Sequence, residues 1–359
     1  MKTGIIGLPQ SGKTTLYNAV SRSSVDLYAD SEPRIAVIQV PDPRFEHAVA
    51  VCSPKKRTPA TLEITDGAAR IEAAAHSRSG GRGTGDFLAG VRLMDALVLV
   101  VRAFRDAAGA ATDPVRDAQQ LMEELVLADQ ILVETRLERL EKGHLQKRES
   151  PAEAAERHAL LKVLVHLEAG LALRTLEMTE DEQRCLRGFA FVSAKPLIVV
   201  ANTDEGADAD SPEISALSAF AGQHGAGFTA LCCKLEAEIA QMNPAEEREF
   251  LEALGLAAPA RDRLIREAYS ALGLICFFTV GDDEVRAWTV AKGTIAVQAA
   301  EKIHSDIARG FIRAEVIAWE LFEAAGGCWD DARGAGHARL EGKEYIVRDG
   351  DVMHIRFKV

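Results

Sequence analysis

The residues nearest the N-terminus have the types and spacing of a phosphate-binding loop. Residues 7–14, GLPQSGKT, fit the pattern G-x-x-x-x-G-K-[ST]. They follow a predicted short buried strand, Lys2 to Ile6, and precede a helix-like stretch, Thr15 to Val20. In such a loop the glycines let successive N–H groups point at phosphate oxygens, and the helix adds its partial positive end. The pattern predicts a site for a nucleoside triphosphate with Mg²⁺.

Three side chains are candidates for the chemistry at this loop. We predict Lys13 as the catalytic residue, because it can reach the outer phosphates and stabilise charge on a transferring phosphoryl group. The Thr14 hydroxyl is predicted to ligate Mg²⁺. The strand-like stretch Thr61 to Asp66 ends in a carboxylate. We predict Asp66 as the second Mg²⁺ ligand, bound to the ion through a water molecule. The alternative for Asp66 is an ordinary turn aspartate at a strand end.

The turn expected to meet the base follows an apolar strand at Pro196 to Ala201 and reads Asn202-Thr203-Asp204-Glu205. Guanine-specific proteins of this fold read N-K-x-D there, and the Asp accepts two hydrogen bonds from guanine. Here Thr203 stands in place of the Lys and Glu205 in place of the Asp. The Glu205 side chain is one methylene longer than Asp, so its carboxylate should miss the geometry of those two hydrogen bonds. We predict ATP as the ligand, with GTP as the alternative. A polar turn without base contact is the other alternative.

The elements around these residues indicate an α/β fold. Ala96 to Val101 is predicted as a buried parallel strand and Gly227 to Leu231 as a shorter one, as in a Ras-like P-loop NTPase domain. Residues 112–193 between the strands have a helical pattern, with a helix start at Pro114 and a capping box at Ser150. They predict an antiparallel helical hairpin. Basic residues gather toward its tip: Arg136, Arg139, Lys142, Lys147 and Arg148. An RNA or ribosome contact is one interpretation, but interleaved glutamates favour a solvated surface.

The C-terminal stretch indicates a separate small domain. Strands are predicted at 276–280, 285–290, 345–347 and 352–357, with a helix at 294–309. This order is typical of a ubiquitin-like β-grasp unit, which we expect to bind a macromolecule. We therefore predict a nucleotide domain at 1–111 and 194–272, a helical hairpin insertion at 112–193 and a β-grasp domain at 273–359.

The bulk composition excludes several classes of protein. The chain has 359 residues, enough for two or three domains, and a formal net charge of −12. A net negative charge argues against a protein that wraps around a large nucleic-acid surface. No apolar run approaches the ~20 residues of a membrane span. The N-terminus does not have the pattern of a signal peptide. Its six scattered cysteines fit a reducing compartment. We expect a cytoplasmic protein that is not in a membrane.

With these residues placed, the chain resembles the YchF family of Obg-like ATPases nearly end to end. The distinctive stretches are 40–44, 202–205, 234–239, 284–289, 310–316 and 349–352. The resemblance implies a Ras-like domain, a helical hairpin, a C-terminal TGS domain, ATP preferred over GTP, Mg²⁺ and ribosome association, hence a role in translation or a stress response. Its nucleotide residues carry over to Gln10, Ser11, Gly12, Lys13, Thr14 and Thr15, and to Asn202, Thr203 and Glu205.

The sequence departs from the family pattern where hydrolysis is controlled. Residues 25–33 contain no threonine for Mg²⁺, and Ser31 is a weak substitute. Ala69 replaces a family glycine, Arg70 a hydrophobic residue, and 102–113 lacks the family's histidine. We therefore predict that binding is kept while hydrolysis is slow. The alternative from another class is a nucleotide-sensing module with vestigial hydrolysis. A small-molecule kinase is disfavoured, because no arginine-rich lid is evident.

Overall fold

The computed structural model describes residues 1–24, 34–66, 90–105, 112–144, 150–208 and 210–358. This part of the chain divides into two compact units. Unit 1 comprises Met1–Ala36 and Glu63–Leu264, and unit 2 comprises Val37–Leu62 and Ile265–Val359. The segment Val37–Leu62 therefore packs with the C-terminal residues, whereas the sequence-based division placed it in the nucleotide domain. The helical hairpin lies within unit 1, and its independence as a domain stays a proposal.

A six-stranded sheet with the order β2-β4-β1-β5-β6-β7 organises unit 1. The strands are β1 (Lys2–Gly7), β2 (Arg34–Gln39), β4 (Thr61–Asp66), β5 (Ala96–Ala103), β6 (Leu197–Thr203) and β7 (Gly227–Leu231). Strand β1 pairs in parallel with β4 and β5, and β6 pairs in parallel with β5 and β7. Parallel strands end at the same edge, so the ends of β1, β4 and β6 are brought together there. The expected α/β class is confirmed.

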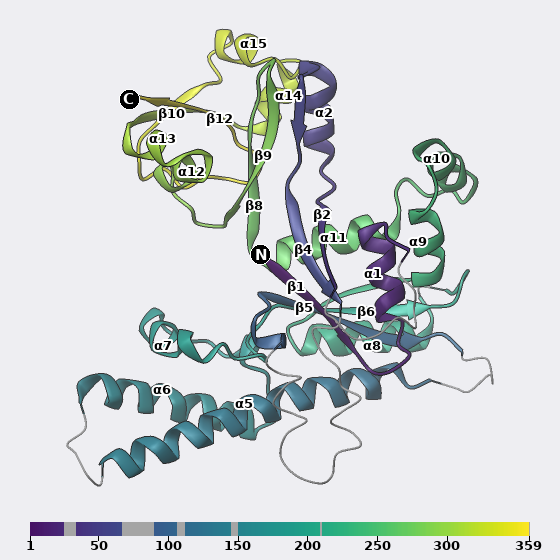
Figure 1. Cartoon of the computed structure of the whole chain (residues 1–359), viewed down its shortest axis with the longest axis vertical. Coiled ribbons are helices and arrows are strands. Elements are labelled where there is room, and N and C mark those ends of the chain that lie inside the picture. Colours follow the sequence, from purple (N-terminus) through teal and green to yellow (C-terminus); the bar gives the residue numbers. More distant parts are fainter. Residues whose placement is uncertain (25–33, 67–89, 106–111, 145–149, 209, 359) are drawn as a thin grey trace. The chain divides into compact units, whose positions relative to one another are not determined.

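Helices cover both faces of this sheet, which explains why β5 is apolar throughout. On one face, α5 (Pro114–His144) and α8 (Pro212–Gln223) pack Leu121 and Leu217 against Leu97, Leu99 and Val101. The other face carries α1 (Lys13–Ser21) and α9 (Cys233–Ala240) (Figure 1). Unit 1 ends with α10 (Pro244–Ala253) and the first part of α11 (Ala260–Ala271).

The predicted hairpin consists of α5 and α6 (Pro151–Glu168), followed by α7 (Glu180–Leu186) and two short 3-10 turns, Leu173–Thr175 and Arg187–Phe189. The capping box at Ser150 is present. Val133 and Leu137 of α5 pack with Leu160 and Val163 of α6. Residues 145–149, which include part of the predicted basic tip, lie outside the described residues.

Unit 2 is built on a second six-stranded sheet, β11-β10-β12-β8-β9-β3. Its strands are β3 (Lys56–Thr58), β8 (Leu274–Thr279), β9 (Glu284–Ala291), β10 (Phe311–Ile317), β11 (Arg339–Glu341) and β12 (Val352–Phe357). The helices are α2 (Pro43–Cys52), α12 (Ala296–Ile303), α13 (Ser305–Arg309), α14 (Trp319–Ala324) and α15 (Trp329–Gly334). The edge strand β3 comes from the N-terminal half of the chain and pairs in parallel with β9.

Two local predictions in unit 2 are wrong. The strand expected at 345–347 is reduced to one isolated bridge, between Ile295 and Ile346. The bridge consists of two hydrogen bonds, from Ala296 N to the Tyr345 carbonyl and from Val347 N to the Thr294 carbonyl, and it joins this segment to the start of α12. The helix expected at 294–309 is also interrupted, since His304 is extended (φ −164°) between α12 and α13.

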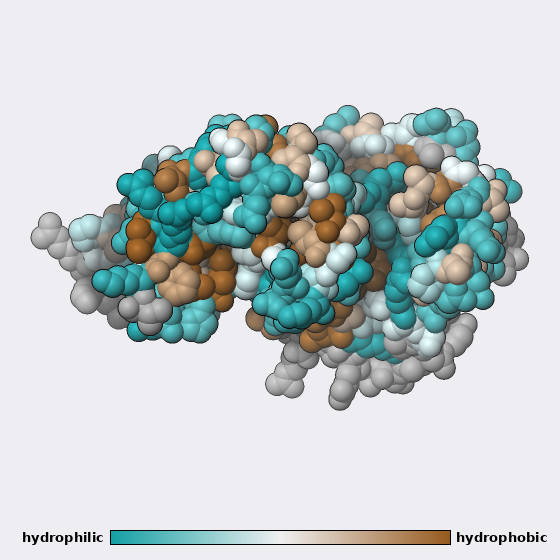
Figure 2. Space-filling view, turned by 90° about the horizontal axis from the view of Figure 1, so that it is seen from above, coloured by the Kyte–Doolittle hydropathy of each residue, from teal (hydrophilic) through white to brown (hydrophobic). Residues whose placement is uncertain are grey.

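The described part of the chain has no helix suited to span a membrane. No described helix is both long enough and apolar enough to cross a bilayer. On the face shown in Figure 2, small groups of hydrophobic side chains alternate with hydrophilic ones.

Candidate nucleotide-binding site

The loop at residues 7–14 connects the end of β1 to the start of α1, as its pattern predicts. Gln10 and Gly12 have positive φ angles of 61° and 98°, which curl the backbone. A Cβ atom on Gly7 would lie 2.6 Å from the carbonyl oxygen of Val100, and one on Gly12 would collide with the side-chain amide of Asn202. Both glycines are therefore required for the loop to sit between β5 and β6.

The ammonium group of Lys13 lies at this loop. Its Nζ donates to the carbonyl oxygens of Gly7 (3.1 Å) and Leu8 (2.7 Å). The loop is closed by Ser11 N donating to Leu8 O over 3.2 Å. Gln10, Ser11 and Gly12 thus belong to a loop that carries one cation and leads into a helix N-terminus, and Thr14 and Thr15 lie in the first turn of that helix. A loop of this kind binds polyphosphate.

Asn202, at the end of β6, ties the loop to the next element. Its Nδ2 donates to the carbonyl of Ser11 (2.9 Å), and its Oδ1 accepts from Cys233 N (3.0 Å) at the start of α9. Asn202 is 5% exposed, so both ends of its amide are used inside the protein. This geometry favours a positioning role for Asn202 over direct contact with the base.

The other residues of the base turn are open to a ligand. Thr203 is half-buried at the end of β6, and Glu205 is exposed in the turn that follows. The neighbouring Asp204 accepts from Arg105 N over 3.2 Å, which anchors the turn. Lys234 is exposed in the first turn of α9. Their exposure leaves Thr203, Glu205 and Lys234 accessible to a ligand.

The predicted Mg²⁺ ligands come from two elements, Thr14 from α1 and Asp66 from the end of β4. Asp66 ends β4 and is 6% exposed, with Arg34 Nη1 3.9 Å from its carboxylate. Burial raises the pKa of Tyr17, and the Asp66 charge adds to that rise. Thr14 and Tyr17 are three residues apart on α1 and so lie on one face of that helix.

A hydroxyl and a carboxylate fit Mg²⁺, which prefers oxygen ligands and keeps several waters and substrate oxygens. Within the described ranges, no three His, Cys, Asp or Glu side chains gather as a metal site. That finding does not conflict with Mg²⁺, because nucleotide oxygens and water complete its ligands.

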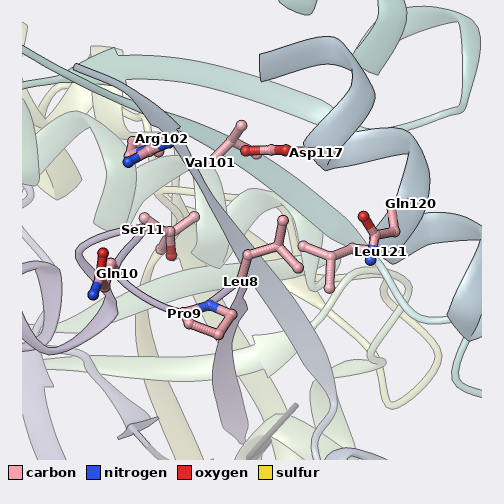
Figure 3. Close-up of a pocket in the computed structure, with 10 residues that line it drawn as sticks. Leu8, Pro9, Gln10, Ser11, Val101, Arg102, Asp117, Gln120 and Leu121 are labelled. Atoms are coloured by element: carbon pink, nitrogen blue, oxygen red, sulfur yellow. The ribbon is translucent and has the colours of Figure 1, made fainter. Parts of the chain in front are cut away.

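A pocket of about 290 Å³ lies beside the loop. In Figure 3, Leu8 of the loop and Leu121 of α5 lie opposite one another, with Asp117 and Gln120 on the α5 side and Gln10, Ser11 and Arg102 on the loop side. Burial raises the pKa of Asp117. Sequence reasoning predicted the start of this helix but not that its first turns face the phosphate loop.

Known proteins match the whole chain. The chain is 38% identical over 371 residues to the ribosome-binding ATPase YchF of Bacillus subtilis, covering 100% of both chains. It is 38% identical over 368 residues to the protein of that name from Haemophilus influenzae, covering 100% of this chain and 99% of that one. The chain belongs to the YchF family.

Two further comparisons agree with this YchF assignment. Residues 274–358 match the family YchF-GTPase_C, described as a protein of unknown function (DUF933). The structure of the Schizosaccharomyces pombe YchF GTPase is similar, with a TM-score of 0.83, 29% identity and coverage of 99% of this chain and 97% of that chain. The resemblance stated from sequence is therefore confirmed at the family level.

Several YchF departures cannot be placed in the site. Residues 25–33, 67–70 and 106–111 lie outside the described residues, and they include Ser31, Ala69 and Arg70. Arg34 and Tyr17, which sequence reasoning missed, lie beside Asp66. Neither residue belongs to a recognised motif, and Arg34 reaches Asp66 because β2 lies next to β4 in the sheet.

Proposed function

We propose that this YchF-family protein binds ATP with Mg²⁺ and slowly hydrolyses it to ADP and phosphate. The observation that carries the proposal is the Lys13 ammonium held at a curled, glycine-dependent loop between β1 and α1. The names of the bacterial relatives, ribosome-binding ATPases, support the same activity.

Named residues bind the nucleotide and stabilise its phosphates in the proposed reaction. The amides of 7–14 hold the phosphate chain, while Lys13 stabilises charge on the outer phosphates as water attacks the terminal phosphorus. Thr14 and Asp66 would hold Mg²⁺, which neutralises phosphate charge when bound. Asn202 keeps the loop in place through Ser11 O.

A single-turnover assay with radiolabelled ATP tests the activity. We expect slow Mg²⁺-dependent phosphate release, reduced about 10²–10³-fold in Lys13→Ala, the loss typical of removing one transition-state donor. Circular dichroism would show that the variant is folded. Equal release by wild type and variant would refute the assignment of Lys13.

The choice of ATP over GTP rests on Thr203 and Glu205. Glu205 is exposed and one methylene longer than the Asp that reads guanine, so we propose that it does not select guanine. The similar fission yeast structure is titled a GTPase, so GTP remains the rival ligand. Calorimetric titration with each nucleotide, with and without Mg²⁺, separates them: at least tenfold tighter ATP binding is expected.

A second candidate is a nucleotide-sensing module with vestigial hydrolysis. Ala69 and Arg70, where the family has a glycine and a hydrophobic residue, favour it. Restoring glycine with Ala69→Gly distinguishes the two. A large gain in turnover indicates a damaged switch, whereas unchanged turnover indicates that hydrolysis is dispensable here.

We also propose that the protein associates with ribosomes in the cytoplasm, through the α5–α6 hairpin and the β-grasp unit. The names of its relatives support the partner. On the hairpin, Arg136 is paired with Glu156 (2.7 Å) and Lys142 with Glu138 (3.4 Å), so Arg139 is the better RNA candidate. Cosedimentation with ribosomes tests this: Arg139→Glu should weaken binding, with Arg184→Glu on α7 as the charge-matched control.

A further inference from the structure

Two cysteines of unit 2 come together from distant parts of the chain. Cys52 is the last residue of α2, and Cys328 directly precedes α15. The sulfur of Cys52 lies 3.9 Å from the carbonyl oxygen of Gly327, the residue bonded to Cys328. Cys328 also acts electrostatically on Cys52. Cys52 therefore lies beside the backbone that leads into Cys328, although 275 positions separate Cys52 from Gly327.

The backbone before Cys328 has a conformation that lets it approach the end of α2. Gly326 and Gly327 have φ angles of 74° and 71°, in the left-handed region that favours glycine. A Cβ atom on Gly327 would lie 3.1 Å from Cγ2 of Val51. The missing side chain thus lets the turn reach the last turn of α2.

Within unit 2, access distinguishes this pair from the third thiol, Cys276. Cys52 and Cys328 are both partly exposed, so a small oxidant can reach them. Cys276, in the same unit, is buried and directs its sulfur at Asp42 instead. Cys185 is exposed on α7 of unit 1.

We propose that Cys52 and Cys328 are a reversible thiol pair that a hydroperoxide oxidises to a disulfide. The Cys328 thiolate attacks a peroxide oxygen, forming an S–O bond as the O–O bond breaks and the alcohol or water leaves with a proton. The Cys52 thiolate then attacks the sulfenic sulfur and expels hydroxide, which leaves as water. Two thiols lose two electrons, and the peroxide gains them.

The order of attack follows from burial. Burial, the largest influence, raises the pKa of Cys52 and makes its thiolate scarce. Cys328 is therefore assigned the first attack and Cys52 the resolving step. The bond would fasten the Val37–Leu62 segment to the C-terminal part of unit 2 across a long stretch of chain, which restricts the unfolded state.

Peptide mapping of the full-length protein tests the proposal. Reduced protein is treated with hydrogen peroxide, digested without reductant and analysed by mass spectrometry. We expect a peptide pair linked through Cys52 and Cys328 that dithiothreitol releases. We also expect a thermal midpoint several degrees higher after oxidation. Cys185→Ser should keep both effects, and Cys52→Ser should lose both.

Finding both cysteines as free thiols or sulfinic acids in the oxidised wild type would overturn the proposal. So would a link from either cysteine to Cys185 as the main product. The mapping needs no variant, so its result stands even if Cys52→Ser unfolds.

Discussion

The guanidinium of Arg44 donates to the carboxylate of Asp349 over 2.9 Å, across 305 residues of chain. The same guanidinium donates to Asp42 over 2.9 Å, and Cys276 N donates to the other oxygen of Asp349 over 2.9 Å. A Cβ atom on Gly350 would lie 2.6 Å from Arg44 Nη1. Two of the stretches that carried the family resemblance, 40–44 and 349–352, therefore meet in unit 2.

Removing this guanidinium should destabilise unit 2. Arg44→Ala leaves the Asp42 carboxylate, with 12% of its side chain exposed, without its charged partner. We expect a loss of about 2–3 kcal/mol in the free energy of unfolding. Urea unfolding measures it. The control is Lys55→Ala, whose pair with Asp283 has side chains 81% and 88% exposed and should cost under about 1 kcal/mol.

Acid should weaken unit 2 through Asp42. Burial alone would raise its pKa, but hydrogen bonds and the charge of Arg44 outweigh burial and hold the pKa of Asp42 below its usual range. The stabilisation is therefore complete above the unfolded-state pKa of about 3.9 and is lost as the pH falls through the lower folded value. Asp42→Asn should give a shallower decline of stability below about pH 4. An unchanged acid slope would contradict this account.

Loss of the Asn202 amide should weaken nucleotide binding without unfolding the protein. Asn202→Ala leaves Ser11 O and Cys233 N without their partner, so the loop loses its anchor. We expect about tenfold weaker ATP binding, equivalent to 1.4 kcal/mol. Asn243→Ala is the matched control, because Asn243 caps α10. It should lower stability by about 1 kcal/mol and leave affinity unchanged.

A side chain at Gly12 should abolish binding. Gly12→Ala places a Cβ atom against the Asn202 amide at a φ of 98°. We expect at least about a hundredfold weaker ATP binding, or 2.7 kcal/mol. Gly222→Ala, in α8 with open space around it, should raise stability by up to about 1 kcal/mol and keep affinity. Retained binding in Gly12→Ala would show that the loop tolerates a different shape.

Periodic and buried elements were predictable from the sequence, and so was the phosphate loop. The strand Gly227–Leu231 and the start of α5 at Pro114 lie where the patterns placed them. Their signals are local: apolar runs, a helix-starting proline and a capping box.

The parts that sequence reasoning missed depend on tertiary pairing. Lys56–Thr58 has no apolar alternation, and it forms a strand because β9 offers it an edge. Likewise, the contact of Asn202 with Ser11 joins residues 191 positions apart. Conversely, Tyr345–Val347 has strand composition, but its backbone bonds to the start of α12. The strand propensities of residues do not show which other segment their backbone will bond to.

The most direct test of the account is calorimetric titration of ATP and GTP, with Mg²⁺, into the wild type and Lys13→Ala. The central claim is that the loop at 7–14 grips a polyphosphate with this ammonium. It predicts measurable triphosphate binding by the wild type and a loss of at least about a hundredfold in the variant, or 2.7 kcal/mol. Undiminished affinity of Lys13→Ala for both nucleotides would contradict it.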